Sequence, residues 1–427
     1  MKRLENYVEE LVKFTLLSHI NQTLDFDLGL SIEFCSGLLK PEPDDAVSLS
    51  AGNRLDGQSI LEGVPLYPLY KRLASALCCS VNQRAFCRTY KAVGLINEDV
   101  FSKQREEEWN GLVLDKGSEL VNVNFELHVD EPFFSLIKDG VKTVEGRCAV
   151  GDYNRIGSGA MILLNKCMLL EVQCVRHYAS FLEMLEAENL EKVLPGVQTI
   201  EEGVRIYRKF YVEEKERSNG VLALCVSSIP SQPYISLGSI LSGLSYGGIQ
   251  SLLGLAHTAG TISNALPPPR SSLLSSFMFP FKPNVKSSTL THGARALAKH
   301  ANRSNYKYWG ILNGSVRNGV LFGVYILVWD FILRMLMYVL EKLKGYEVVL
   351  NHPLSNIVYS DKNRLAMDVI GRLIAHCCWL NVHIVPPHGI VFEIRVAGGY
   401  GARWSKDGTK AEAIMFKDEM HLIWKSV

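Results

Sequence analysis

Within the stretch DGVKTVEGR at residues 139–147, three charged side chains fall in the last six positions: Lys142, Glu145 and Arg147. The run KTVEGR alternates as a strand does, so Thr143, Glu145 and Arg147 share one face, while Lys142 lies at the preceding turn. A buried carboxylate between two cations is costly unless every charge is paired or a ligand completes the set. The alternative is an exposed edge strand with solvated charges, and the spacing alone favours that alternative.

The residues around this stretch predict a small closed barrel over residues 122–227. VNVNFELHV alternates like a strand, AMILLNKCMLLEVQCVRHY reads as two strands joined by a turn, and GVLALCVS reads as a buried strand. Helices are expected between the strands. Asp130 and Pro132 are expected to begin the first helix, and Gly140 to end it. Ser180 and Thr199 are expected to cap later helices. Asn165 and Lys166 are expected to form the turn between the two middle strands.

Over the same residues the sequence resembles the ASCH (activating signal cointegrator homology) domain family, which has a PUA-like barrel. Gly140, Lys142, Glu145 and Arg147 fit its G-x-K-x-x-E-x-R pattern, and the segment VRHYASFLEMLEAENLEKVLPGVQTIEEGVRIYRKFY resembles the following helices. The resemblance implies an inward cleft suited to RNA, a nucleotide or a modified nucleoside, and it reverses the preference for a solvated edge strand. The expected ligand-binding residues are Lys142, Thr143, Glu145, Arg147 and Arg176.

A second hypothesis is hydrolysis of an acylated nucleoside. Some bacterial proteins of this family are understood to cleave the amide of acetylated cytidine with a lysine, a threonine nucleophile and a later glutamate. The lysine falls on Lys142 and the later glutamate on or near Glu188, but the nucleophile position is Glu145. Thr143 lies two positions away, and Glu145 would raise the pKa of Lys142 and weaken it as a base. Lys142, Glu145 and Glu188 are the catalytic residues of this alternative, in which a carboxylate would activate water.

The charge of the predicted barrel limits what it binds. Residues 122–227 contain 12 Lys and Arg against 16 Asp and Glu. A net negative domain does not hold phosphate backbones by bulk charge. A small ligand or a single flipped base therefore fits better than a long duplex.

The rest of the chain divides by composition into regions around that barrel. Residues 1–121 carry apolar residues at helical spacing and predict a helical domain, a candidate surface for a protein partner. Residues 228–317 are rich in Ser, Gly and Pro, lack acids, and predict a basic linker. Residues 318–427 predict a mixed α/β region with a hydrophobic helix and a β-hairpin. The fold class is α+β.

Residues 319–340 are the most hydrophobic stretch, and they raise a third hypothesis of a membrane-tethered adaptor. Asp330 and Arg334 interrupt the stretch at a spacing that lets them pair, so a buried or partner-facing helix is favoured over a membrane span. The first residues lack the apolar run of a signal peptide, and no cysteine stands in a CxxC. We expect an intracellular protein of the cytoplasm or nucleus.

No metal or cofactor site is expected. The one His/Cys cluster has irregular spacing for zinc and lies in apolar runs, so core packing is favoured. Its members are His376, Cys377, Cys378, His383 and His388. The basic stretch 270–317 interleaves aromatic residues and offers a second route to RNA, although a solvated linker is the favoured interpretation.

Overall fold

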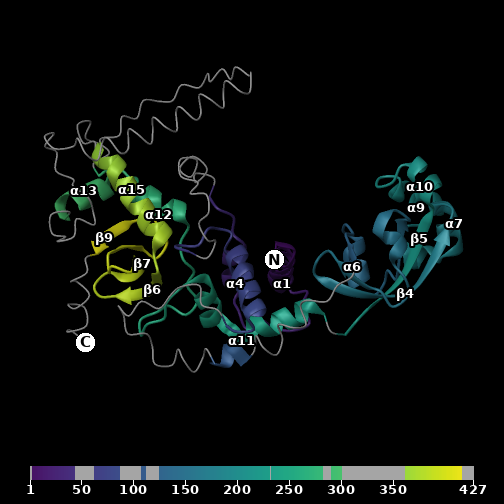
Figure 1. Cartoon of the computed structure of the whole chain (residues 1–427), viewed down its shortest axis with the longest axis horizontal. Coiled ribbons are helices and arrows are strands. Elements are labelled where there is room, and N and C mark those ends of the chain that lie inside the picture. Colours follow the sequence, from purple (N-terminus) through teal and green to yellow (C-terminus); the bar gives the residue numbers. More distant parts are fainter. Residues whose placement is uncertain are drawn as a thin grey trace, which may run out of the picture.

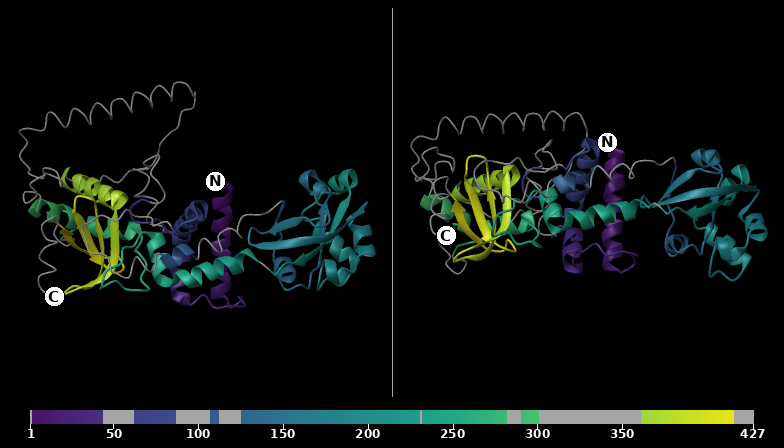
Figure 2. Two further views of the ribbon diagram at one scale, coloured as in Figure 1. Left: turned by 60° about the horizontal axis from the view of Figure 1, so that its bottom comes forward. Right: turned by 90° about the horizontal axis from the view of Figure 1, so that it is seen from below.

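The computed structural model describes residues 2–43, 62–86, 107–111, 125–230, 232–281, 290–300 and 361–415. Within these ranges the chain is an α+β protein, as expected from the sequence. Three parts follow one another in space: a curled sheet with short helices, a helical domain, and a second sheet covered by helices (Figure 1). The two further views show the same order (Figure 2).

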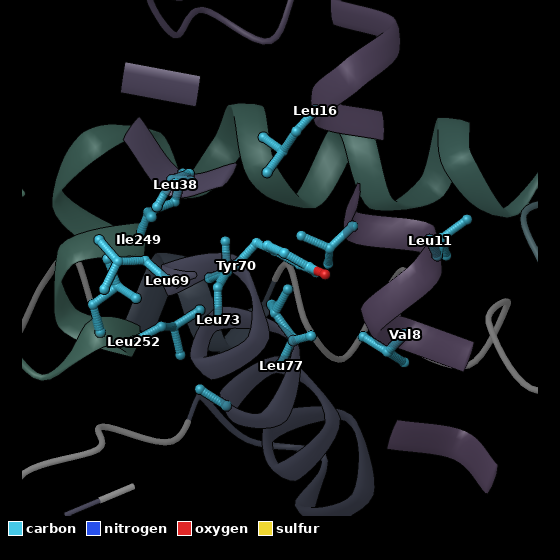
Figure 3. Packing of buried hydrophobic residues seen from close by; sticks show 14 of the residues in the cluster. Val8, Leu11, Leu16, Leu38, Leu69, Tyr70, Leu73, Leu77, Ile249 and Leu252 are labelled. Carbon is cyan, nitrogen blue, oxygen red and sulfur yellow. The ribbon is translucent and has the colours of Figure 1, made fainter. Parts of the chain in front are cut away.

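The helical domain is built around α1 (Lys2–Ile20), α2 (Ile32–Leu39), α4 (Leu69–Gln83) and α11 (Pro233–Leu253). Helix α1 buries Val8, Leu11 and Leu16, which recur at helical spacing and therefore form one apolar stripe. This stripe packs against the buried faces of the other three helices (Figure 3). The expectation of helices at the N-terminus is met because the apolar period continues through the whole of α1 and α4.

Helix α11 lies where the composition predicted a linker, and this part of the expectation is wrong. The uncharged segment is buried, with Leu237, Ile240 and Leu252 among its fully covered residues. Its glycines allow close packing: a Cβ atom on Gly238 would lie 2.2 Å from the ring of Phe26. The segment lacks charges because it is core. Composition alone does not separate that case from a solvated linker.

The curled sheet contains five strands in the order β1-β3-β4-β5-β2. They are β1 (Phe125–Leu127), β2 (Val144–Cys148), β3 (Met161–Leu164), β4 (Met168–Tyr178) and β5 (Val221–Ser228). Only the β1–β3 pair is parallel. The sheet forms a half-barrel, in contrast to the closed barrel expected from the sequence, because β1 and β2 are its two edges.

Short helices surround the half-barrel: α6 (Phe133–Lys138), a 3-10 turn (Gly151–Arg155), α7 (Phe181–Ala187), α8 (Leu190–Val193), α9 (Ile200–Tyr207) and α10 (Glu213–Asn219). The two predicted caps are confirmed. The Ser180 hydroxyl accepts from the Glu183 N–H at 3.1 Å, and the Thr199 hydroxyl accepts from the Glu202 N–H at 3.2 Å. Each cap satisfies an N–H that has no partner within its helix.

The second sheet follows α12 (Arg270–Met278), α13 (His292–His300) and α15 (Asp361–His376). It is antiparallel in sequence order: β6 (Trp379–Val385), β7 (Gly389–Arg395), β8 (Gly401–Ser405) and β9 (Ala411–Met415). Strands β6 and β7 form a hairpin across the Pro-Pro-His-Gly turn. The buried Trp404 side chain donates from Nε1 to the carbonyl of Leu273 at 3.2 Å, which ties this sheet to α12.

No helix in the described ranges is both long and apolar enough to span a bilayer. The hydrophobic stretch 319–340 lies outside the described residues, as do residues 301–317 of the basic stretch 270–317, whose earlier part forms α12 and α13.

Candidate functional site

Edge strand β2 carries the charged residues that the sequence singled out. Its register with β5 places Glu145 opposite Leu224 and Arg147 opposite Leu222. The alternate residues of β2 face the opposite way and pack against α7 and α9. Strand alternation therefore separates the polar residues of β2 from its apolar ones, as the pattern predicted.

Glu145 joins the two cations. Its Oε2 lies 3.0 Å from Lys142 Nζ, and its Oε1 lies 3.0 Å from Arg147 Nη2. The exposed fractions of the three side chains are 1% for Lys142, 10% for Glu145 and 14% for Arg147. Two cations thus share one carboxylate almost entirely out of water, so the cluster carries a net positive charge.

The Lys142 ammonium is held on all sides. It donates to the carbonyl of Val144 at 2.7 Å and to the carbonyl of Val193 in α8, in addition to its contact with Glu145. An ammonium has three protons, and these three acceptors can take all of them. Burial, and secondarily Arg147, lowers the pKa of Lys142 although Glu145 opposes that change. The sequence-based expectation considered only the effect of Glu145.

Arg147 bridges the two edges of the half-barrel. Its Nη2 donates to the carbonyl of His128, which directly follows β1. Burial is the largest single influence and lowers the pKa of Arg147, but Glu145, Tyr211 and Tyr153 together outweigh it and raise the pKa overall. The Arg147 Nε is buried and has no hydrogen-bond acceptor among the residues that the structure describes. The guanidinium therefore keeps one donor without a partner at the seam between β1 and β2.

Aromatic residues surround this guanidinium. The hydroxyl of Tyr211 lies beside it, and Tyr153 is close enough to affect its pKa. Tyr207 stacks on Phe181 with ring centroids 4.2 Å apart. Burial raises the pKa of the Tyr207 hydroxyl well above its usual value. These tyrosines could not be predicted from the sequence, because their positions along the chain carry no spacing signal.

Gly146 lies between the two charged residues of β2 for a steric reason. A Cβ atom at this position would lie 2.5 Å from the Tyr207 Oη and 2.8 Å from the Met184 Cε. The Tyr207 Oη is buried against this backbone and forms no hydrogen bond of standard geometry. A glycine here allows Tyr207 and β2 to approach closely.

Thr143, Arg176 and Glu188 do not join this cluster. The Thr143 backbone N–H donates to the carbonyl of Lys192 at 3.0 Å, and its carbonyl accepts from the Val226 N–H at 2.9 Å. Arg176 Nη1 lies 2.6 Å from Glu188 Oε1, to which the Tyr178 hydroxyl also donates at 2.8 Å.

The register places Arg176 opposite Ala223, on the face of the sheet that packs against α7. Glu145 lies opposite Leu224, on the other face. The structure therefore brings Lys142, Glu145 and Arg147 together and sets Arg176 and Glu188 apart from them.

The His/Cys cluster of the second sheet is spread over unrelated contacts. Cys377 is buried and contacts the Ile374 carbonyl, His383 lies 3.2 Å from Glu393, and His388 lies 3.7 Å from Glu412. Among the described residues no three His, Cys, Asp or Glu side chains are grouped as metal ligands would be.

Comparison with known proteins identifies one region of the chain. Residues 127–230 match the family model of the ASCH domain. The solved structure of hypothetical protein PH0355 and the solution structure of protein PF0455 from Pyrococcus furiosus are each 42% identical to this chain. Each comparison covers 25% of this chain and 98% of the other, with TM-scores of 0.24 and 0.23.

No curated protein matches the chain. The ASCH match places the chain in the PUA-like superfamily, which includes RNA-binding domains. Through residues 127–230 the chain belongs to the ASCH domain family.

Proposed function

We propose that the ASCH domain binds single-stranded RNA or a nucleotide at the seam between β1 and β2, with Arg147 as the contact residue. The observation that carries this proposal is the Arg147 guanidinium, which is partly exposed, has an Nε without a partner and belongs to a cluster with excess positive charge. A buried charge without compensation is unfavourable, so an anionic group at this seam would complete the cluster.

Lys142 and Glu145 act in this proposal as positioning residues. The ammonium of Lys142 is committed to two backbone carbonyls and to Glu145, and it has no free proton for a ligand. Glu145 in turn holds one edge of the guanidinium at 3.0 Å. Fixing the guanidinium before the ligand arrives reduces the entropy lost on binding.

The neighbouring tyrosines support a ligand with a flat ring. Tyr153 is half-buried and Tyr211 lies beside the guanidinium, so both are close to the seam. Stacking of a base on an aromatic side chain contributes about 1–3 kcal/mol and tolerates different bases. Since the domain carries 16 acids against 12 basic residues, we expect few phosphate contacts and a short binding site.

Amide hydrolysis receives less support from the geometry. The lowered pKa of Lys142 would favour a base, but its protons are directed to three acceptors. Glu188, the third residue of that hypothesis, pairs with Arg176 on the other face of the sheet. Incubation of the protein with acetylated cytidine tests this alternative directly, because turnover would require a rearrangement of both groups.

Titration of the full chain with a short fluorescent single-stranded RNA at two salt concentrations tests the binding proposal. We expect the logarithm of the binding constant to fall linearly with the logarithm of the salt concentration, with a slope of about 0.7 per contacted phosphate. Arg147→Lys keeps the charge but loses the planar fork, and it should weaken binding by about tenfold. The matched control is Arg155→Lys, since Arg155 is 78% exposed in the same domain. Equal binding by the wild type and Arg147→Lys would contradict the proposal.

A further inference from the structure

A cavity of about 640 Å³ lies between helix α1 and the half-barrel. One wall comes from α1 outside the ASCH domain, and the other comes from β1, α6, the 3-10 turn and the β3–β4 turn. Ligand sites in proteins commonly have volumes of roughly 300–1,000 Å³ and often form between domains. The volume of this cavity lies within that range, and its place between two domains is one where ligand sites often form.

Helix α1 turns a second face toward this cavity. Glu10, Lys13, Phe14 and Leu17 recur at the spacing of one helix face, away from the apolar stripe that packs in the helical domain. The Phe14 ring meets the Phe134 ring edge-on, with centroids 5.9 Å apart. This contact and the bond from Lys138 Nζ to the Thr23 carbonyl at 2.9 Å hold the half-barrel against α1.

Two lysines line the cavity without partners. Among the described residues, neither the ammonium of Lys13 on α1 nor that of Lys166 in the β3–β4 turn makes an ion pair or hydrogen bond. Lys166 has φ of +57°, in the left-handed region, where it completes the turn after Asn165. Asn165 fixes that turn by pairing with both backbone groups of Val129 at 2.8 Å.

The other side chains that line the cavity restrict the chemical class of ligand that fits it. Within the described part of the chain, the Glu10 carboxylate makes no hydrogen bond or ion pair, and Tyr153 presents an aromatic ring. Glu126 adds a second acid, so the four charged side chains around the cavity balance one another. This balance disfavours a polyphosphate. It suits a molecule with one anionic group for the lysines, a flat ring, and an amino group that donates to a carboxylate.

We propose that this cavity binds a nucleoside monophosphate unit whose base carries an exocyclic amino group, and that α1 contributes half of the site. The phosphate would lie between Lys13 and Lys166, and the amino group would donate to Glu10. The cavity is next to the seam, since His128 lines it and accepts from Arg147. The inference deepens the proposed function and rests on it for the class of ligand.

Calorimetric titration of the full chain with cytidine, adenosine and uridine 5′-monophosphates, and with inorganic phosphate, tests this assignment. We expect cytidine and adenosine monophosphates to bind more tightly than uridine monophosphate and phosphate. Lys13→Glu should weaken binding by at least about tenfold. The matched control Lys406→Glu makes the same charge change at an exposed residue of the second sheet and should have no effect. Glu10→Gln should reduce the preference for the amino-bearing bases.

The source of the ligand is tested in a second arm with a short single-stranded oligonucleotide. Tighter binding of the oligonucleotide, lost in Lys13→Glu, would assign the cavity to one nucleotide of an RNA strand. Equal binding would assign it to a free nucleotide. Nucleotide binding with the same affinity in Lys13→Glu as in the wild type would overturn the inference. Oligonucleotide binding that depends on Arg147 but is unaffected by Lys13→Glu would overturn it while leaving the proposed function intact.

Discussion

Glu145→Gln should destabilise the ASCH domain selectively. The substitution keeps the size of the side chain but removes the carboxylate that lies 3.0 Å from both Lys142 and Arg147. Removing one partner of a buried ion pair commonly costs about 3–5 kcal/mol, since a buried charge is left uncompensated. We expect the lower end, about 3 kcal/mol, because Lys142 keeps two carbonyl acceptors.

Hydrogen exchange followed by mass spectrometry measures this loss of stability in β2 and β5, which pair directly with each other. A loss of about 3 kcal/mol corresponds to roughly hundredfold faster exchange of amides that open with the domain. Exchange in α4 should be unchanged, since α4 lies in the helical domain. The control is Glu186→Gln, an exposed acid on α7, which should leave all rates alone.

A second variant separates charge from shape. Lys142→Met combined with Glu145→Gln removes the more deeply buried cation together with the carboxylate. We expect the pair to be more stable than Glu145→Gln alone, because apolar replacement of a buried ion pair is often neutral. Unchanged exchange in Glu145→Gln, or a double variant less stable than the single one, would refute the role given to the buried charges.

Gly146→Ala should destabilise the domain by about 1–3 kcal/mol through overpacking. Its control is Gly157→Ala, which should not destabilise the domain because a Cβ atom there meets nothing within 4 Å. Denaturant midpoints measure both effects, and adding Tyr207→Phe to Gly146→Ala should recover part of the lost stability. Gln232→Ala removes two hydrogen bonds to the β4 backbone, at 2.9 and 2.8 Å, and should lower the free energy of unfolding by about 1–3 kcal/mol. The effect should be measurable as faster proteolysis between the half-barrel and α11. Proteolysis of the variant at the wild-type rate would contradict this prediction. Burial raises the pKa of Glu393, but its hydrogen bond to histidine and two nearby arginines outweigh burial and lower it. A lowered pKa gives stability that is present above the unfolded value near 4.5 and is lost as pH falls below it. Thermal melts of wild type and Glu393→Gln from pH 7 to pH 3 should therefore converge at low pH, and a constant difference would contradict the assignment.

Local patterns allowed much of the ASCH domain to be predicted from sequence. The caps at Ser180 and Thr199 and the turn at Asn165 depend on residues close in sequence, and they appear as expected. The alternation of β2 also predicted that Glu145 and Arg147 share a face. These features depend on short-range chemistry that a single sequence displays directly.

Features that depend on distant contacts were missed. The burial of α11 depends on packing against α1 and α4, which nothing in its own Ser- and Gly-rich sequence reveals. The bridge from Arg147 to the carbonyl of His128 joins two strand edges, and the contact of Lys142 with Val193 joins a turn to a later helix. Backbone acceptors leave no signal in residue type, so neither contact could be inferred from spacing.

The central claim is that the seam beside Arg147 receives the ligand. Hydrogen exchange of the full chain with and without a saturating short single-stranded RNA measures this most directly. Slower exchange in β1 and β2 of the wild type is the predicted result. The slowing should be clearly smaller in Arg147→Lys when both proteins are compared at an RNA concentration near the wild-type dissociation constant. RNA that binds yet slows exchange only in segments away from both strands would contradict the claim.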